Sequence, residues 1–166
     1  MQLTHYSKKF TPKTFPITLI CDNVTSAPNI GGLFRTADAF GVEQIIFCGS
    51  EIPKGRKMTK ASRSTEKFVT YQDNRDIIET LSRLKSKDCL IVALEITSNS
   101  GSIKDFEFPK NKPIALILGA ENFGVSESAL NMVNYAIHIE MFGHNSSMNL
   151  VQAASIALFE VTTQLI

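Results

Sequence analysis

Two segments near the C-terminus combine an apolar run with polar residues that could bind a small molecule. The segment 116–126 (LILGAENFGVS) and the segment 139–149 (IEMFGHNSSMN) each start apolar and end in glycine and small polar residues. In an open α/β sheet, ligands bind where parallel strands stop and loops begin. A carboxylate such as Glu121, just beyond a fully apolar strand, is costly unless it has a partner or a function. The two strand ends therefore predict one shared pocket.

A third polar segment follows the first predicted strand and leads into a predicted helix over 30–40. Asn29 is expected to cap this helix, because its side chain can accept a bond from the first free N–H groups. Gly31 and Gly32 fall in the first turn, where each costs about 1 kcal/mol relative to alanine. We therefore expect a ligand or another helix to approach them closely. Arg35 lies one turn beyond Gly31 and either forms a surface ion pair with Asp38, three positions on, or acts on a ligand.

The usual signatures of several enzyme classes are missing from the chain. No G-x-G-x-x-G follows the first predicted strand and there is no Walker loop, which disfavours a Rossmann dinucleotide fold and a P-loop enzyme. The cysteines Cys21, Cys48 and Cys89 are far apart and lack metal-ligand spacing. We therefore expect no metal site and buried, reduced thiols.

Strands and helices are predicted to alternate along the chain. The expected strands are 17–22, 44–48, 67–70, 89–95, 114–118 and 136–140, and the expected helices are 30–40, 75–85, 126–133 and 150–164. This order predicts an α/β fold with a mostly parallel sheet and helices on both faces. We expect a basic N-terminal extension over 1–16 and a single domain over 17–166.

The composition is that of an ordinary globular domain. Of 166 residues, 43% are hydrophobic and 20% are charged, with a net charge of +1. No apolar run is long enough to span a bilayer and the N-terminus has no signal-peptide core, so we expect a cytoplasmic protein without a membrane partner.

The charge is unevenly distributed between the two parts of the chain. Residues 1–70 contain ten Lys/Arg and five Asp/Glu, whereas residues 71–166 contain seven and eleven. The densest cluster of cations, which we call the basic segment, falls in an expected loop and contains Lys54, Arg56, Lys57, Lys60 and Arg63. Such a cluster in a nearly neutral protein favours binding to a phosphate backbone over a simple solvated loop.

Three segments together resemble the motifs of the SPOUT superfamily, specifically its SpoU/TrmH branch of RNA ribose 2′-O-methyltransferases. They are 29–41 (NIGGLFRTADAFG), 119–126 (GAENFGVS) and 139–150 (IEMFGHNSSMNL). The three segments occur in the family's order and spacing, and the resemblance extends over about 17–160.

The resemblance implies a deep trefoil knot in the C-terminal region, a rare exception to the rule that chains do not thread loops. It also implies a homodimer, S-adenosylmethionine as cofactor and RNA as partner. The positions that match the family's catalytic and RNA-orienting set are Arg35, Asn29, Glu121, Ser147 and Asn149. The positions that match its cofactor pocket are Glu95, Ile96, Leu118, Gly119, Gly124, Ile139, Met141, Gly143, Ser147 and Met148.

The resemblance also assigns interfaces. The Gly31–Gly32 face and the helix from Leu150 match parts of the dimer interface, which would explain the costly glycines. RNA recognition would fall to the basic segment, to the partner subunit and to Lys8, Lys9 and Lys13.

The implied reaction is attack of a ribose 2′-oxygen on the sulfonium methyl group. Because an incipient alkoxide meets a cation, charge cancels in the transition state, so a dry site that orients the reactants is what catalysis needs. Arg35 acts either as the base or as a clamp that holds the adjacent phosphate and polarises the 2′-OH. The resemblance implies the role of base, and the clamp is an equally good role because a guanidinium scarcely deprotonates in proteins.

Several alternatives stay open at this level. Transfer RNA is the favoured substrate, with a D-loop guanosine ahead of a wobble nucleotide, and ribosomal RNA is an alternative. A non-catalytic RNA-binding factor on the same scaffold is disfavoured by the joint presence of the catalytic set. An unrelated flavodoxin-like domain leaves the segment 139–150 unexplained.

Overall fold

The computed structural model describes Ser7 and residues 10–166 of the chain. Lys8 and Lys9, expected to help in RNA recognition, lie outside the described residues, whereas Lys13 stacks over the Phe15 ring, 4.6 Å from its centroid. Nothing in the structure tests the predicted division into an extension and a domain.

A seven-stranded parallel sheet forms the centre of the described part of the chain, in the order β3-β2-β1-β6-β4-β7-β5. Every strand pairing in it is parallel. The strands are β1 (Phe15–Asp22), β2 (Val42–Cys48), β3 (Thr70–Arg75), β4 (Leu90–Leu94), β5 (Gly101–Ser102), β6 (Ile114–Gly119) and β7 (Tyr135–His138). The predicted α/β class is confirmed, while the trefoil knot stays a prediction.

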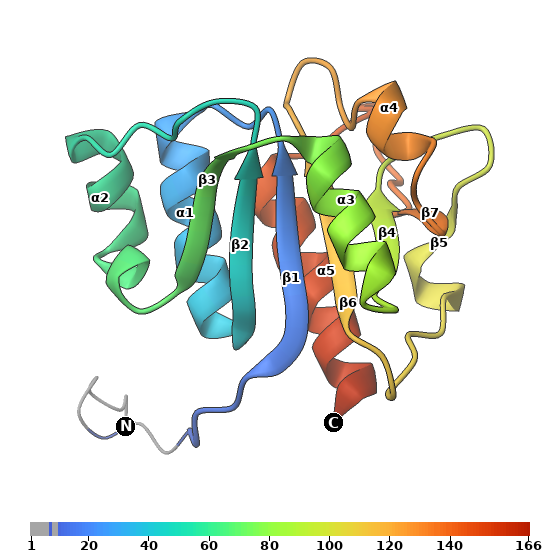
Figure 1. Ribbon diagram of the computed structural model, residues 1–166, viewed down its shortest axis with the longest axis horizontal. Coiled ribbons are helices and arrows are strands. Elements are labelled where there is room, and N and C mark those ends of the chain that lie inside the picture. The colour runs from blue at the N-terminus through green and yellow to red at the C-terminus, as the bar shows by residue number, and fades with distance from the viewer. Residues whose placement is uncertain (1–6, 8–9) are drawn as a thin grey trace.

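Helices cover both faces of this sheet. The α-helices are α1 (Ala27–Ala39), α2 (Arg56–Ser62), α3 (Ile77–Ser86), α4 (Glu127–Leu130) and α5 (Leu150–Leu165), and the 3-10 turns are η2 (Thr65–Lys67) and η3 (Ile103–Asp105). Figure 1 shows α1 and α5 on one face, with α3 and α4 on the other. Each face has its own apolar core: α1 and α5 contribute to the first, and α3 and α4 to the second. The central strands are apolar on both sides for this reason.

Helix α1 begins earlier than expected. Its N-cap is Ser26, and Pro28 occupies the first turn, where a missing N–H costs nothing. Asn29 is therefore inside the first turn and does not cap the helix, so its amide is available for other contacts.

Gly31 and Gly32 are explained by packing within the chain. A Cβ on Gly31 would clash with the backbone of α2, at Met58 O, and would lie 2.7 Å from the Ala61 Cβ. A Cβ on Gly32 would lie 2.8 Å from Val151 Cγ2 on α5. The expectation that this glycine face lies in a dimer interface is wrong, because helices of the same chain already occupy it.

The basic segment is largely helical, contrary to the expectation of a loop. Met58 and Ser62, one turn apart, are its two buried positions on α2. Because only one of them is apolar, the helix gives little periodic signal in the sequence. The third strand is likewise shifted from 67–70 to Thr70–Arg75, because the sheet edge it forms is polar and only partly buried. The two-residue strand β5 was not expected.

All three cysteines are free and buried. Burial raises the pKa of Cys48 to about 11 and that of Cys89 to about 11. The pKa of the Cys21 thiol is raised further by the same cause.

Candidate active site

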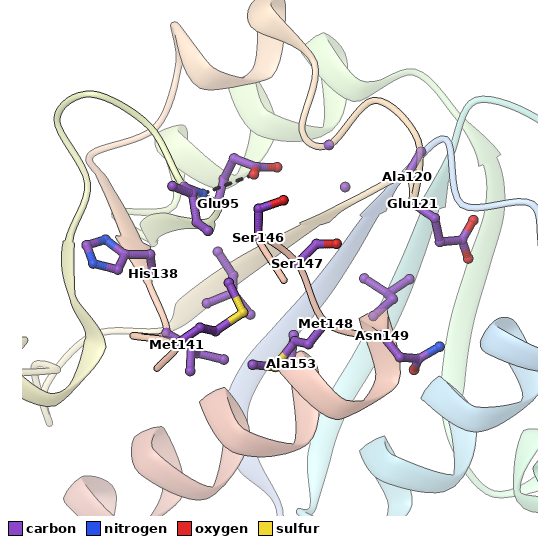
Figure 2. Close-up of a pocket in the computed structure, with 16 residues that line it drawn as sticks. Glu95, Ala120, Glu121, His138, Met141, Ser146, Ser147, Met148, Asn149 and Ala153 are labelled. Carbon is purple, nitrogen blue, oxygen red and sulfur yellow. Dashed lines mark hydrogen bonds between the residues drawn. The ribbon is translucent and has the colours of Figure 1, made fainter. Parts of the chain in front are cut away.

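The two predicted polar strand ends meet at the carboxyl edge of the sheet. There they enclose a pocket of about 440 Å³, formed by the ends of β4, β6 and β7 and by the start of α5 (Figure 2). It is lined by Leu94, Glu95, Ile96, Gly119, Ala120, Glu121, Gly124, His138, Ile139, Met141, Ser146, Ser147, Met148, Asn149, Leu150 and Ala153. This is where an open α/β sheet is expected to bind a ligand.

Eight of the ten positions assigned to a cofactor pocket line this cavity. The other two do not: Leu118 is fully buried inside β6, and Gly143 is exposed on the loop before α5. Sequence reasoning did not assign Ala120, Ser146 and Leu150 to the pocket, although they lie inside the quoted motifs, and it missed Leu94, His138 and Ala153 altogether. The predicted ends of the strands over 89–95 and 136–140 could have pointed to Leu94 and His138, since both stand at carboxyl ends.

A tight hairpin separates the pocket from the neighbouring loop after β1. The Ala120 N–H donates to Gly124 O at 3.2 Å and the Gly124 N–H donates to Ala120 O at 2.8 Å. Gly124 has a φ of +67°, and a Cβ there would clash with the Glu95 carboxylate. A Cβ on Gly119 would lie 2.0 Å from the carbonyl carbon of Gly124. The hairpin therefore requires both glycines, because a side chain fits at neither position.

Two carboxylates fix the base of this hairpin from opposite sides. Asp22, only 1% exposed at the end of β1, accepts the Ser126 N–H at 2.8 Å and the Asn23 amide at 3.0 Å. Glu95, at the end of β4, accepts the Val125 N–H at 2.9 Å. Hydrogen bonds to a charged acceptor are stronger than neutral ones, so these contacts restrain the hairpin from both neighbouring strands.

Three residues assigned to the catalytic set meet in one hydrogen-bonded chain. Asn149 caps α5, its Oδ1 accepting the Val151 N–H at 2.9 Å, while its amide donates to Asn29 Oδ1 at 3.1 Å. The Asn29 amide in turn donates to Glu121 Oε1. We call this series of hydrogen bonds the Asn149–Asn29–Glu121 network. It provides the hydrogen-bond partner that a carboxylate just beyond a buried strand requires.

The other two assigned residues stand apart from the network. Ser147 lines the pocket, near Asn149 on the same loop (Figure 2). Arg35 is exposed on α1 and makes no hydrogen bond or ion pair with any residue that the structure describes, so the alternative pairing with Asp38 does not form.

The pocket is acidic. Glu95 and Glu121 line it, and among the described residues no lysine or arginine does. The Glu140 carboxylate nearby is paired with Lys104, which raises the pKa of that lysine. His138 lies on the pocket wall with its Nδ1 2.9 Å from Ser100 Oγ. Such a lining favours a ligand that carries positive charge.

The basic segment lies away from the pocket, on α2 and at its two ends, beyond α1 (Figure 1). Lys54 is paired with Asp73 at 3.3 Å, a contact that raises the pKa of the lysine. Arg56, Lys57, Lys60 and Arg63 are exposed and unpaired within the described residues.

The described residues contain no group of His, Cys, Asp and Glu side chains that could hold a metal ion. None of their helices is long and apolar enough to cross a bilayer.

The sequence model of the SpoU rRNA methylase family matches residues 16–159 of this chain. The chain belongs to this family. The predicted branch of the SPOUT superfamily and the predicted enzyme class, an RNA methyltransferase, are thereby confirmed.

Individual relatives agree with this membership. A tRNA (guanosine(18)-2′-O)-methyltransferase of Thermus thermophilus is 31% identical over 150 residues, which cover 89% of this chain and 75% of the relative. The TrmH/SpoU tRNA modifying enzyme of A. aeolicus has a TM-score of 0.81 at 26% identity, covering 90% of this chain and 75% of that one. The SpoU methyltransferase AviRb of Streptomyces viridochromogenes, in complex with AdoMet, has a TM-score of 0.80 at 24% identity, covering 93% and 59%.

Removing the Asp22 carboxylate is expected to destabilise the fold. Asp22→Ala leaves the partly buried Ser126 N–H without its charged acceptor and should lower the free energy of unfolding by roughly 1.5–3 kcal/mol. The matched control is Lys112→Ala, which breaks an exposed ion pair with Asp88 and should cost only about 0–1 kcal/mol. Urea unfolding measures both. Equal losses in the two variants would contradict the role given to Asp22.

Proposed function

We propose that this RNA methyltransferase transfers the methyl group of S-adenosylmethionine to a ribose 2′-oxygen of transfer RNA in the cytoplasm, with a D-loop guanosine as the favoured nucleotide. The observation that carries the proposal is the Asn149–Asn29–Glu121 network. It joins one residue from each of the three SpoU motifs at the mouth of the pocket. The guanosine is favoured because the Thermus thermophilus relative is named for that reaction.

The pocket suits the proposed cofactor in charge and in size. S-adenosylmethionine carries a sulfonium cation and an ammonium group, and Glu95 and Glu121 give the pocket a negative lining. A volume of about 440 Å³ lies in the range of small-molecule sites. The neighbour AviRb holds AdoMet on the same fold, which supports the same ligand here.

Orientation is the main contribution of the protein to the proposed reaction. The 2′-oxygen bonds to the methyl carbon as the carbon–sulfur bond breaks, the hydroxyl proton is released to water, and S-adenosylhomocysteine leaves. Asn29, Glu121 and Asn149 hold the ribose in line with the methyl group, with Ser147 beside them. Arg35 clamps the adjacent phosphate and polarises the hydroxyl, since its guanidinium keeps its proton. Its lack of a partner among the described residues leaves it available for RNA.

Methylation of defined RNAs tests the function. S-adenosylhomocysteine should bind with a saturable heat signal and raise the melting temperature, because it binds only the folded state. Labelled S-adenosylmethionine should then methylate an unmodified tRNA transcript at a ribose, which mapping of 2′-O-methyl positions locates. Transfer only to ribosomal RNA fragments would show that the substrate is ribosomal RNA and not transfer RNA. Cofactor binding without transfer to either RNA would indicate a non-catalytic factor.

Substitution of the catalytic residue Arg35 should lower turnover, whereas substitution of the RNA-binding residues should lower RNA affinity. Arg35→Ala should abolish single-turnover methylation and leave S-adenosylhomocysteine affinity intact, because Arg35 does not line the pocket. The double variant R56A/K57A should weaken RNA binding and lower the log–log salt slope by about one unit per lost contact. Its rate at saturating RNA should not change.

Lys54→Ala is the matched control for the salt measurement. Lys54 belongs to the same basic segment but is paired with Asp73, so its removal should change the salt slope less. Near-normal turnover by Arg35→Ala, or a full salt slope in R56A/K57A, would refute the corresponding assignment.

We also propose that the chain forms a homodimer through α5. This helix exposes Ile156 (43%) and Phe159 (62%), three positions apart and hence on one side, and apolar surface of this kind favours a symmetric contact. Phe159→Asp should convert a dimer to a monomer in light scattering. Phe68→Asp, a control at an exposed phenylalanine outside α5, should not. A wild-type chain that is monomeric at micromolar concentration would overturn the proposal.

A further inference from the structure

We propose that the base of the acceptor nucleotide lies in a second cavity, on the far side of the 120–124 hairpin from the cofactor pocket, stacked on Phe123. This inference rests on the proposed function. The cavity measures about 450 Å³ and is lined by Asn23 and Thr25 of the loop after β1 and by the hairpin through Ser126. Phe123 is not among the catalytic or cofactor-binding residues assigned above.

Phe123 projects into solvent from a hairpin that several hydrogen bonds restrain. Its side chain is 91% exposed at the tip of the hairpin, although it lines the second cavity. The paired hydrogen bonds between Ala120 and Gly124 close the hairpin behind it, and the Asp22 and Glu95 carboxylates fix its base. An exposed aromatic ring on a fixed loop gives a stacking surface with little entropy to lose on binding, which is how proteins hold unstacked RNA bases.

The second cavity is adjacent to the proposed chemistry. Ala120, Glu121 and Gly124 line both cavities, so the hairpin is their common wall. Glu121 also accepts the hydrogen bond of the network from Asn29. A base on the Phe123 side therefore places its own ribose at the end of the hairpin where Glu121 stands, between the base and the methyl donor.

The cavity also offers groups that can contact the polar edge of a base. Thr25 and Asn122 line it and are exposed, and neither side chain hydrogen-bonds within the described part of the chain. A hydroxyl and an amide supply both donors and acceptors. Stacking on Phe123 with an edge facing these two groups suits an unpaired nucleotide in an RNA loop better than a base inside a duplex.

A double-mutant cycle, in which Phe123 is substituted and the base of the acceptor nucleotide is removed, tests the inference. Single-turnover methylation is measured on an unmodified tRNA transcript and on the same transcript with an abasic ribose at the nucleotide that mapping identifies. Phe123→Ala should raise the RNA concentration for half-saturation by about 5- to 150-fold, the usual effect of losing one stacked base. The penalty should disappear on the abasic RNA, and Phe123→Tyr should restore binding. The affinity for S-adenosylhomocysteine should not change in either variant.

Phe142→Ala is the matched control. Phe142 is 93% exposed on the loop before α5 and lines neither cavity, so its removal should leave half-saturation unchanged. An equal loss in Phe142→Ala, wild-type binding by Phe123→Ala, or a Phe123→Ala penalty that persists on the abasic RNA would overturn the inference. A wild-type chain that methylates no RNA would overturn the proposed function and the inference with it. An active wild type with any of the three earlier results would overturn the inference alone.

Discussion

The hydrogen bonds that Asp22 and Glu95 make to the backbone N–H groups of Ser126 and Val125 hold the site together. The two carboxylates come from the ends of β1 and β4, the strands that flank β6 in the sheet, so the loop leaving β6 is tied to both of its neighbours. The position of Glu121 depends on this restraint, because Glu121 belongs to the hairpin whose base these bonds fix. A buried carboxylate such as Asp22 is stable here because N–H groups replace the water it has lost.

The site unites parts of the chain that are remote in sequence and different in charge. Asn29 comes from the basic part of the chain, whereas Glu121 and Asn149 come from the acidic part, which also supplies the whole pocket lining. The resulting division is physically sensible for the proposed reaction. A cationic cofactor meets an acidic pocket, while the polyanionic RNA is attracted to exposed cations on α2, outside that pocket.

The sequence predicted the central architecture and most of the pocket, because both depend on strong local signals. Apolar strands that stop at glycine and polar residues indicated β1, β6 and the pocket, and α5 was predicted nearly to its last residue. The wrong predictions concern features whose sequence pattern is weak or which depend on tertiary contacts. Helix α2 is buried at only two positions, β3 is a polar edge strand, and the reason for Gly31 is the backbone of α2, which no local pattern reveals.

The contrast between Glu121 and Phe123 shows where sequence reasoning stops. Glu121 could be singled out in advance because a carboxylate after a buried strand requires a partner, and the structure supplies Asn29. Phe123, two positions away, looks in sequence like one more apolar residue that could belong to the core. Only the pairing of Ala120 with Gly124 puts it at the hairpin tip, 91% exposed. Phe142 is equally exposed but lines neither cavity, so it is the place of Phe123 in the wall of the second cavity, together with its exposure, that suggests a stacked ligand.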